Sequence, residues 1–310
     1  MKQLKKDAEK IKSLEIQGAT NVAISAIDFL SDYAKRLSEE NVASCFESLD
    51  RARKILMNTR PTEPAMKNGL KFITSKLEKE RISCSVENIP EKIETYKNQY
   101  LEMLQNSKKK IAEIGVRRFP QGDKKFVVMT HCHSTLVTAI LLEAKRLNKN
   151  FKVVNTETQP RLQGRKTANE LLEAGIEVVH VIDSAMRWAV RHFQVDIILI
   201  GADSITSEGT IINKIGSRLL ALVAHEEHVP FYACTPLLKY NPETNLGLLE
   251  TIEMRDPKEV WENAPEGMTI VNPAFETVSR RYIDGIITEA GIFASSHVPT
   301  YFAKLYPEMD

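Results

Sequence analysis

Hydrophobic residues recur along the chain in two different rhythms. Through roughly the first 115 residues they lie three and four positions apart, which is typical of amphipathic helices. These stripes run through Leu14–Leu30, Val42–Leu56, Ala65–Glu80 and Pro90–Gly115, where Gly115 is expected to cap the last helix. From residue 116 onward, short apolar runs rich in β-branched residues alternate with amphipathic stretches. The pattern predicts a helical segment followed by an α/β segment with a parallel sheet covered on both faces.

The alternating pattern from residue 116 onward is regular enough to assign individual strands and helices. Strands are predicted at Phe126–Met129, Phe151–Asn155, Glu177–Ile182, Ile197–Ile200, Pro230–Ala233 and Ile283–Thr288. Helices are predicted between them at Leu136–Leu147, Lys166–Ala174, Ala185–His192 and Lys214–His225. The glycines fit neither the dinucleotide-binding fingerprint nor the phosphate-binding loop of nucleotide hydrolases, so neither kind of site is expected.

The turn at residues 130–133 is the first place where chemistry is expected. It lies between the carboxyl end of a buried strand and a helix for which Ser134 is a natural N-cap. In open parallel sheets, ligands bind at this edge. The positive end of the helix dipole is expected to lower the pKa of the Cys132 thiol and make it a better base or nucleophile. The alternative is that Cys132 is a small buried hydrophobe.

A carboxylate and several basic residues are predicted at the same edge. The strand Ile197–Ile200 runs directly into Gly201, Ala202 and Asp203. Asp203 could donate or accept a proton, or could only shape a turn. Lys214 is expected to open the following helix, and Lys239 follows a later strand. Lysines beside helix amino termini suit a phosphorylated ligand.

Composition excludes several classes of function. The 310 residues carry 42 Lys and Arg against 41 Asp and Glu, a net charge of +1, which gives no electrostatic footprint for nucleic acid. Long apolar runs and the apolar core of a signal peptide are missing, so we expect no membrane association and a cytoplasmic location. The four cysteines, Cys45, Cys84, Cys132 and Cys234, lie far apart, which favours neither a disulfide framework nor a zinc ribbon.

The histidines are not expected to bind metal. His131 and His133 flank Cys132, but side chains two positions apart on an extended segment point to opposite sides. His225 and His228 lie near a predicted helix end, where histidines commonly compensate the helix dipole. The prediction is therefore a site without metal.

Five motifs together carry a resemblance to a known family. They are THCHS around Cys132, NTETQPRLQGRKTA, IGADSI followed by NKIGS, IEMRDP and NPAFE. They resemble the family that contains sugar-phosphate aldose-ketose isomerases and the regulatory subunits of the exchange factor for translation initiation factor two. The resemblance covers nearly the whole chain. It implies an all-helical domain, residues 1–115, on a Rossmann-like domain, residues 116–310.

The resemblance also implies an activity and an assembly. The activity is conversion of ribose 1,5-bisphosphate to ribulose 1,5-bisphosphate in nucleotide (AMP) salvage, feeding ribulose-bisphosphate carboxylase, with no metal or other cofactor. The assembly is a homo-oligomer built from dimers, for which a hexamer is one candidate. A nucleotide is a candidate activator. The alternative within the family is a non-catalytic regulatory subunit that binds a sugar phosphate, a nucleotide or an initiation-factor subunit.

Site residues carry over from the resemblance position by position. The catalytic cysteine and aspartate fall on Cys132 and Asp203. Substrate contacts fall on Gln17, Gly18, Ala19, Thr20, Arg60, His133, Ser134, Asn213, Lys214 and Lys239. The chain departs from the isomerase pattern, which has Arg-Gly-Ala-Gly in place of residues 17–20 and arginine in place of Gln159. These departures bear on substrate identity and mildly favour the regulatory alternative, whereas retention of both Cys132 and Asp203 favours catalysis.

Overall fold

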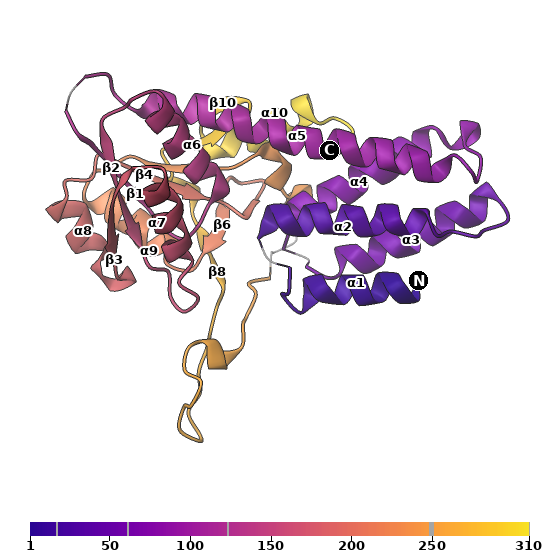
Figure 1. Ribbon diagram of the computed structural model, residues 1–310, viewed down its shortest axis with the longest axis horizontal. Coiled ribbons are helices and arrows are strands. Elements are labelled where there is room, and N and C mark those ends of the chain that lie inside the picture. Colours follow the sequence, from indigo (N-terminus) through magenta and orange to yellow (C-terminus); the bar gives the residue numbers. More distant parts are fainter. Residues whose placement is uncertain (17, 61, 123, 248–250, 310) are drawn as a thin grey trace.

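The computed structural model describes residues 1–16, 18–60, 62–122, 124–247 and 251–309. Its amino-terminal part is built from helices that lie side by side (Figure 1). These are α1 (Lys2–Lys12), α2 (Ala19–Ala34), α3 (Val42–Met57), α4 (Pro64–Lys79) and α5 (Ile89–Gly115). Local sequence explains two of the starts: the Asn41 side chain accepts a hydrogen bond from Ser44 N at 2.9 Å, and Pro64 occupies the first turn of α4.

Helix α5 belongs to both parts of the molecule. Its 27 residues extend for about 40 Å. Near its beginning, Ile93 and Tyr100 pack into the core of the amino-terminal helices, whereas Ile111 near its end packs against the sheet. The expectation that Gly115 caps this helix is wrong, because Gly115 is its last helical residue, with a φ of −63°, and the cap is Val116. A Cβ at Gly115 would lie 2.5 Å from Ile140 Cδ1, so this glycine lets α5 approach α6 (Thr135–Arg146).

The main sheet follows the predicted plan with one addition. Within the described residues it has seven strands, in the order β10-β9-β7-β4-β1-β2-β3. Their bounds are β1 (Phe126–Thr130), β2 (Phe151–Thr156), β3 (Glu177–Val181), β4 (Ile197–Gly201), β7 (Phe231–Cys234), β9 (Gly285–Thr288) and β10 (Gly291–Phe293). The six predicted strands are confirmed and pair in parallel, whereas the short β10 pairs antiparallel to β9 at the edge.

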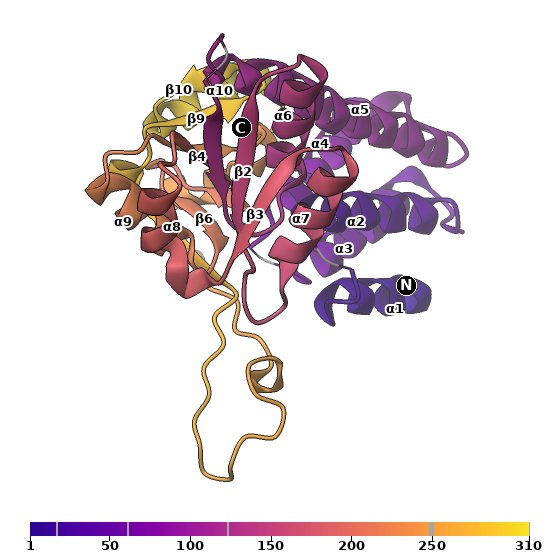
Figure 2. The same cartoon turned by 60° about the vertical axis from the view of Figure 1, so that its left-hand side comes forward.

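Helices cover both faces of this sheet (Figure 2). They are α6, α7 (Gln163–Glu173), α8 (Met186–His192), α9 (Ser217–Glu226) and α10 (Val298–Leu305). Strand β4 is buried along its whole length, and its side chains alternate between two apolar clusters. Leu199 packs with residues of α5, α6 and α7, whereas Ile198 packs with residues of α8 and α9. The continuous apolar run in the sequence therefore reflects burial on both sides.

A second, antiparallel sheet corrects one prediction about the site. It consists of β5 (Ser204–Ile205), β6 (Ile211–Lys214) and β8 (Phe275–Val278). The prediction that Lys214 opens a helix is wrong: Lys214 ends β6, and α9 starts at Ser217 after a left-handed glycine, Gly216. A tight hairpin, in which Thr206 N bonds Thr210 O at 2.9 Å, returns the chain from β5 and makes β6 possible.

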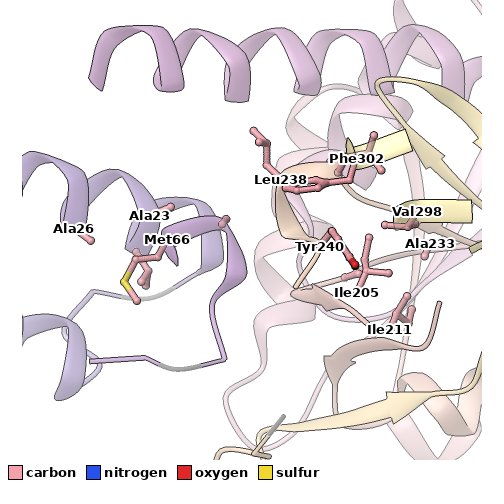
Figure 3. Packing of buried hydrophobic residues seen from close by; sticks show 14 of the residues in the cluster. Ala23, Ala26, Met66, Ile205, Ile211, Ala233, Leu238, Tyr240, Val298 and Phe302 are labelled. Atoms are coloured by element: carbon pink, nitrogen blue, oxygen red, sulfur yellow. The ribbon is translucent and has the colours of Figure 1, made fainter. Parts of the chain in front are cut away.

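The segment that carries Lys239 packs on a buried apolar cluster. Leu238 and Tyr240 lie in it with Ile205 and Phe302 (Figure 3), and the Tyr240 and Phe302 ring centroids are 5.0 Å apart. Asn68 on α4 donates from Nδ2 to the carbonyls of Leu238 and Tyr240, both at 2.8 Å. These bonds join the amino-terminal helices to the segment that carries Lys239.

A long arm, residues 251–273, projects from the sheet part of the molecule (Figures 1 and 2). At its base Arg255 N donates to Asn272 O at 2.8 Å, and Ala274 N donates to Glu253 O at 2.9 Å. Several large apolar side chains on the arm are exposed: Met254, Val260, Trp261, Met268 and Val271.

Candidate active site

One pocket collects most of the residues that were predicted from the sequence. It has a volume of about 280 Å³ and lies where the amino-terminal helices meet the carboxyl edge of the main sheet. Its lining includes the predicted residues Gly18, Ala19, Thr20, Arg60, Cys132, His133, Ser134, Asp203, Asn213, Lys214 and Lys239. Gln17 lies outside the described residues. The size suits a small metabolite rather than a dinucleotide.

Cys132 occupies a strained position in the turn between β1 and α6. Its φ is 67°, a left-handed conformation that is uncommon for residues other than glycine. Two threonines hold it there: Cys132 N donates to Thr158 Oγ1 at 3.0 Å, and Thr167 Oγ1 donates to Cys132 O at 3.0 Å. A backbone strain maintained by side-chain hydrogen bonds favours a functional role over simple packing.

The acidity of Cys132 corrects the prediction drawn from the helix dipole. Burial raises the pKa of its thiol to about 11, and the ammonium of Lys214 opposes this only in part. The expected lowering by α6 is wrong, because loss of hydration penalises the thiolate more than the helix terminus stabilises it. The thiolate, once formed, is accordingly a stronger base.

The two histidines beside Cys132 are engaged within the fold. His131 is buried, with Nδ1 2.6 Å from Thr156 Oγ1 and Nε2 2.7 Å from Ile215 O. Since a carbonyl only accepts, Nε2 carries the proton and Nδ1 accepts from the threonine. Burial lowers the pKa of His131, which keeps the ring neutral. His133 lines the pocket, but its Nδ1 lies 3.1 Å from Thr167 Oγ1 on α7.

Asp203 lies at the end of β4, as predicted, and faces the same pocket. Its backbone N donates to Ile212 O at 2.8 Å, which starts the second sheet. Lys239 Nζ lies 3.8 Å from Asp203 Oδ1 and donates to Ala202 O at 2.6 Å. Lys239 therefore positions the loop that carries Asp203 in addition to lining the pocket.

Lys214 and the neighbouring polar residues provide positive charge and donors. The Lys214 ammonium lies 4.4 Å from the centroid of the Phe275 ring, and burial lowers its pKa. Asn213 Nδ2 donates to Ser217 Oγ at 2.9 Å. Ser134 is the predicted N-cap of α6, accepting from Val137 N at 3.4 Å. Gly18 precedes α2, so the amino end of that helix also faces the pocket.

Arg60 lines the pocket as predicted, but carboxylates surround it. Its side chain is only 5% exposed, and Nη2 lies 3.0 Å from Glu63 Oε1 and 2.6 Å from Glu253 Oε2. Glu63 and Arg255 also line the pocket and were not predicted from the sequence. Arg255 follows Glu253 in the IEMRDP motif, which could have singled it out. Glu63 carries no local signal, because its importance comes from the fold around it.

A larger cavity, of about 480 Å³, lies between α3 and α4. Two of its cations are paired with carboxylates: Lys67 Nζ lies 2.5 Å from Glu243 Oε2, and Arg53 Nη2 lies 2.7 Å from Asp50 Oδ1. The smaller pocket, with its reactive groups and helix amino ends, is the better candidate for an active site.

Comparison with known proteins now places the chain in a family. Residues 15–295 match the initiation factor 2 subunit family. The chain belongs to this family. Ribose 1,5-bisphosphate isomerase of Pyrococcus furiosus is 38% identical to it, over 96% of this chain and 90% of that protein. Within the described residues, moreover, no helix is long and apolar enough to cross a membrane.

Solved structures of family members have the same fold. The translation initiation factor eIF-2B of Pyrococcus horikoshii superimposes with a TM-score of 0.78 at 27% identity, covering 95% of this chain and 98% of that one. The 5-methylthioribose 1-phosphate isomerase of the same organism gives a TM-score of 0.78 at 26% identity, covering 97% and 88%. The predicted class, helices followed by a Rossmann-like α/β part, is confirmed.

Proposed function

We propose that this protein is an aldose-ketose isomerase that converts ribose 1,5-bisphosphate to ribulose 1,5-bisphosphate. The observation that carries the proposal is one pocket in which Cys132 and Asp203 meet Lys214, Lys239 and the amino end of α2. The named isomerases among its relatives support the same reaction class. Nucleotide salvage would be its setting.

The first step of the mechanism must open the sugar ring, which carries a phosphate ester at C1. Because the anomeric oxygen is esterified, the ring cannot open by losing a proton there. Asp203 donates a proton to the ring oxygen as the bond between C1 and that oxygen breaks. Cys132 then removes the proton from C2, which leaves an enediol-type intermediate with the phosphate still on C1.

The second half returns both protons to balance the reaction. Cys132 delivers its proton to C1, while the carboxylate of Asp203 takes the proton of the C2 hydroxyl as the ketone forms. Lys214 and Lys239 supply fixed positive charge for phosphate, which orients the sugar between the thiol and the carboxyl.

The test is turnover of defined substrates by the purified protein. Ribose 1,5-bisphosphate should be converted to ribulose 1,5-bisphosphate, and phosphorus NMR would follow the conversion. Cys132→Ser and Asp203→Asn should each lose about 100- to 10,000-fold in kcat with little change in substrate affinity, and the double variant should lose far less than the product. Lys214→Ala and Lys239→Ala should instead weaken binding by about 1 to 3 kcal/mol each.

Two outcomes would refute the isomerase. One is a panel of C1-phosphorylated pentoses that are neither converted nor able to raise the melting temperature. The other is near wild-type turnover by Cys132→Ser, since the thiol would then serve only for packing.

A regulatory role remains the second candidate, because the chain also superimposes on a translation initiation factor. It predicts stable co-purification with an initiation-factor subunit that survives replacement of both Cys132 and Asp203. Loss of that association, together with turnover of the bisphosphate, would favour the enzyme.

We also expect a homo-oligomer. The exposed apolar side chains on the arm, residues 251–273, favour burial against a second copy. Light scattering should give at least twice the mass of one chain, and a nucleotide activator would be found by titrating AMP into the isomerase assay.

A further inference from the structure

Glu63 lies between the Arg60 guanidinium and the active-site pocket. It directly precedes α4, is only 2% exposed and lines the pocket. Its Oε1 lies 3.0 Å from Arg60 Nη2, and the same nitrogen donates to Glu253 Oε2 at 2.6 Å. Glu253 contacts the same guanidinium as Glu63 but is not part of the pocket lining. Of these two carboxyls, only Glu63 lines this pocket.

The second carboxyl oxygen of Glu63 has no partner. Within the described residues, Oε2 is buried and makes no hydrogen bond. A buried carboxylate oxygen without a donor is costly, and the cost falls if the group is protonated. Burial and the nearby Asp203 raise the pKa of Glu63 to about 8, against the opposing charges of Arg60 and Lys239. Since Oε1 faces the guanidinium, the proton belongs on Oε2.

A protonated Oε2 is a donor that makes no hydrogen bond within the described residues. The pocket that it lines is the one we assign to a phosphorylated sugar, whose phosphate oxygens are strong acceptors. Ionised Glu63 would weaken binding of a phosphate, because it would offset the charge of Arg60 and add a second carboxylate to that of Asp203.

We propose that Glu63 is a substrate-binding residue that donates a hydrogen bond from its protonated carboxyl to an anionic oxygen of the ligand, so that binding is coupled to one proton. This deepens the proposed function by naming a residue and a charge state. The ligand class rests on that function, whereas the coupling does not require turnover. Arg60, Glu253, Asp203 and Lys239 are the charged groups that act on Glu63.

The experiment uses ribitol 1,5-bisphosphate, which has no carbonyl or ring and cannot be isomerised. Calorimetric titrations of the full-length protein in buffers with different ionisation enthalpies count the protons taken up on binding. Wild type should take up almost none at pH 6.5, about half a proton at pH 8 and nearly one at pH 9. Its Kd should weaken toward tenfold per pH unit above pH 8.

Two variants assign the proton to Glu63. Glu63→Gln imitates the protonated form, so it should bind at pH 7 within about threefold of wild type, with no proton uptake and a flat Kd up to pH 9. Glu253→Gln is the matched control, because it removes the other carboxylate from Arg60 and should keep the pH dependence. Uptake that persists in Glu63→Gln, or that disappears in Glu253→Gln, overturns the proposal.

The wild-type protein alone is decisive if the variants fold poorly. Absence of proton uptake between pH 8 and 9 overturns the coupling, even if the enzyme turns over ribose 1,5-bisphosphate normally. Coupled binding without turnover would refute the isomerase and leave the role of Glu63 standing. Failure of ribitol 1,5-bisphosphate and inorganic pyrophosphate to bind at pH 7 would refute both.

Discussion

The acidity of Cys132 leads to a prediction about its chemical reactivity. Only the thiolate reacts with iodoacetamide. Burial raises the pKa of this thiol from an ordinary value of 9.0 to about 11. At pH 7.5 the thiolate fraction should therefore be about 100-fold lower than for the same cysteine in the unfolded chain, roughly 0.03% against 3%.

The assay follows carbamidomethylation of the Cys132 peptide by mass spectrometry between pH 7 and 10, with urea-unfolded protein as the reference. The rate in the folded protein should rise tenfold per pH unit across the whole range, because the midpoint lies above it. This slope is independent of how easily the reagent reaches the half-buried thiol. Lys214→Met should slow the reaction by about a further tenfold, since the ammonium of Lys214 is the main charge that favours the thiolate.

A plateau near pH 8 or below would refute the raised pKa, because it would mean that the amino end of α6 dominates over burial. An unchanged rate in Lys214→Met would refute the role of the Lys214 charge. Cys84 provides an internal comparison, because burial raises its pKa as well but it lies outside the pocket.

Three further predictions concern stability. Asn68→Ala removes the donor shared by the carbonyls of Leu238 and Tyr240 and should lower the free energy of unfolding in urea by about 2 to 6 kcal/mol; a loss below about 0.5 would contradict the buried geometry. Gly164→Ala places a Cβ 1.7 Å from Thr156 O, so it should cost about 3 kcal/mol or more by the same measurement, or prevent folding. Glu63 has a folded pKa of about 8 against 4.5 when exposed, so ionisation destabilises the fold increasingly as pH rises through that window. Glu63→Gln should therefore gain stability over wild type with rising pH, by roughly 5 kcal/mol at most near pH 9, and a difference that is constant with pH would oppose the argument.

The main sheet could be predicted because each of its parallel strands has a recognisable local sequence pattern. Each of the six predicted strands is a compact apolar run, and Ser134 is a cap with a clear signature. The short strands β5, β6 and β8 could not be predicted, because Ile211–Lys214 is too brief to distinguish from the start of a helix. What decides the matter is pairing with Phe275–Val278, some 60 residues later, and no local pattern records that contact.

The candidate site shows the same division. Cys132 and Asp203 follow buried strands, so their edge of the sheet was predictable, and the structure brings both to one pocket. The acidity of Cys132 was predicted in the wrong direction, because a sequence shows the adjacent helix but not the depth of burial. Glu63 was missed because its surroundings come from the segment at Glu253 and from Asp203 and Lys239, all far away along the chain.

The length of α5 has a consequence for how the molecule can be divided. The predicted boundary at residue 115 falls at the end of a helix whose first half packs with one core and whose second half packs with the other. A cut there would leave residues 116–310 without the helix that covers Ile140, and residues 1–115 with an unsheltered apolar stripe. Both parts therefore depend on the same helix, α5. Either half, expressed alone, should aggregate or remain unfolded, whereas the intact chain should melt in one transition.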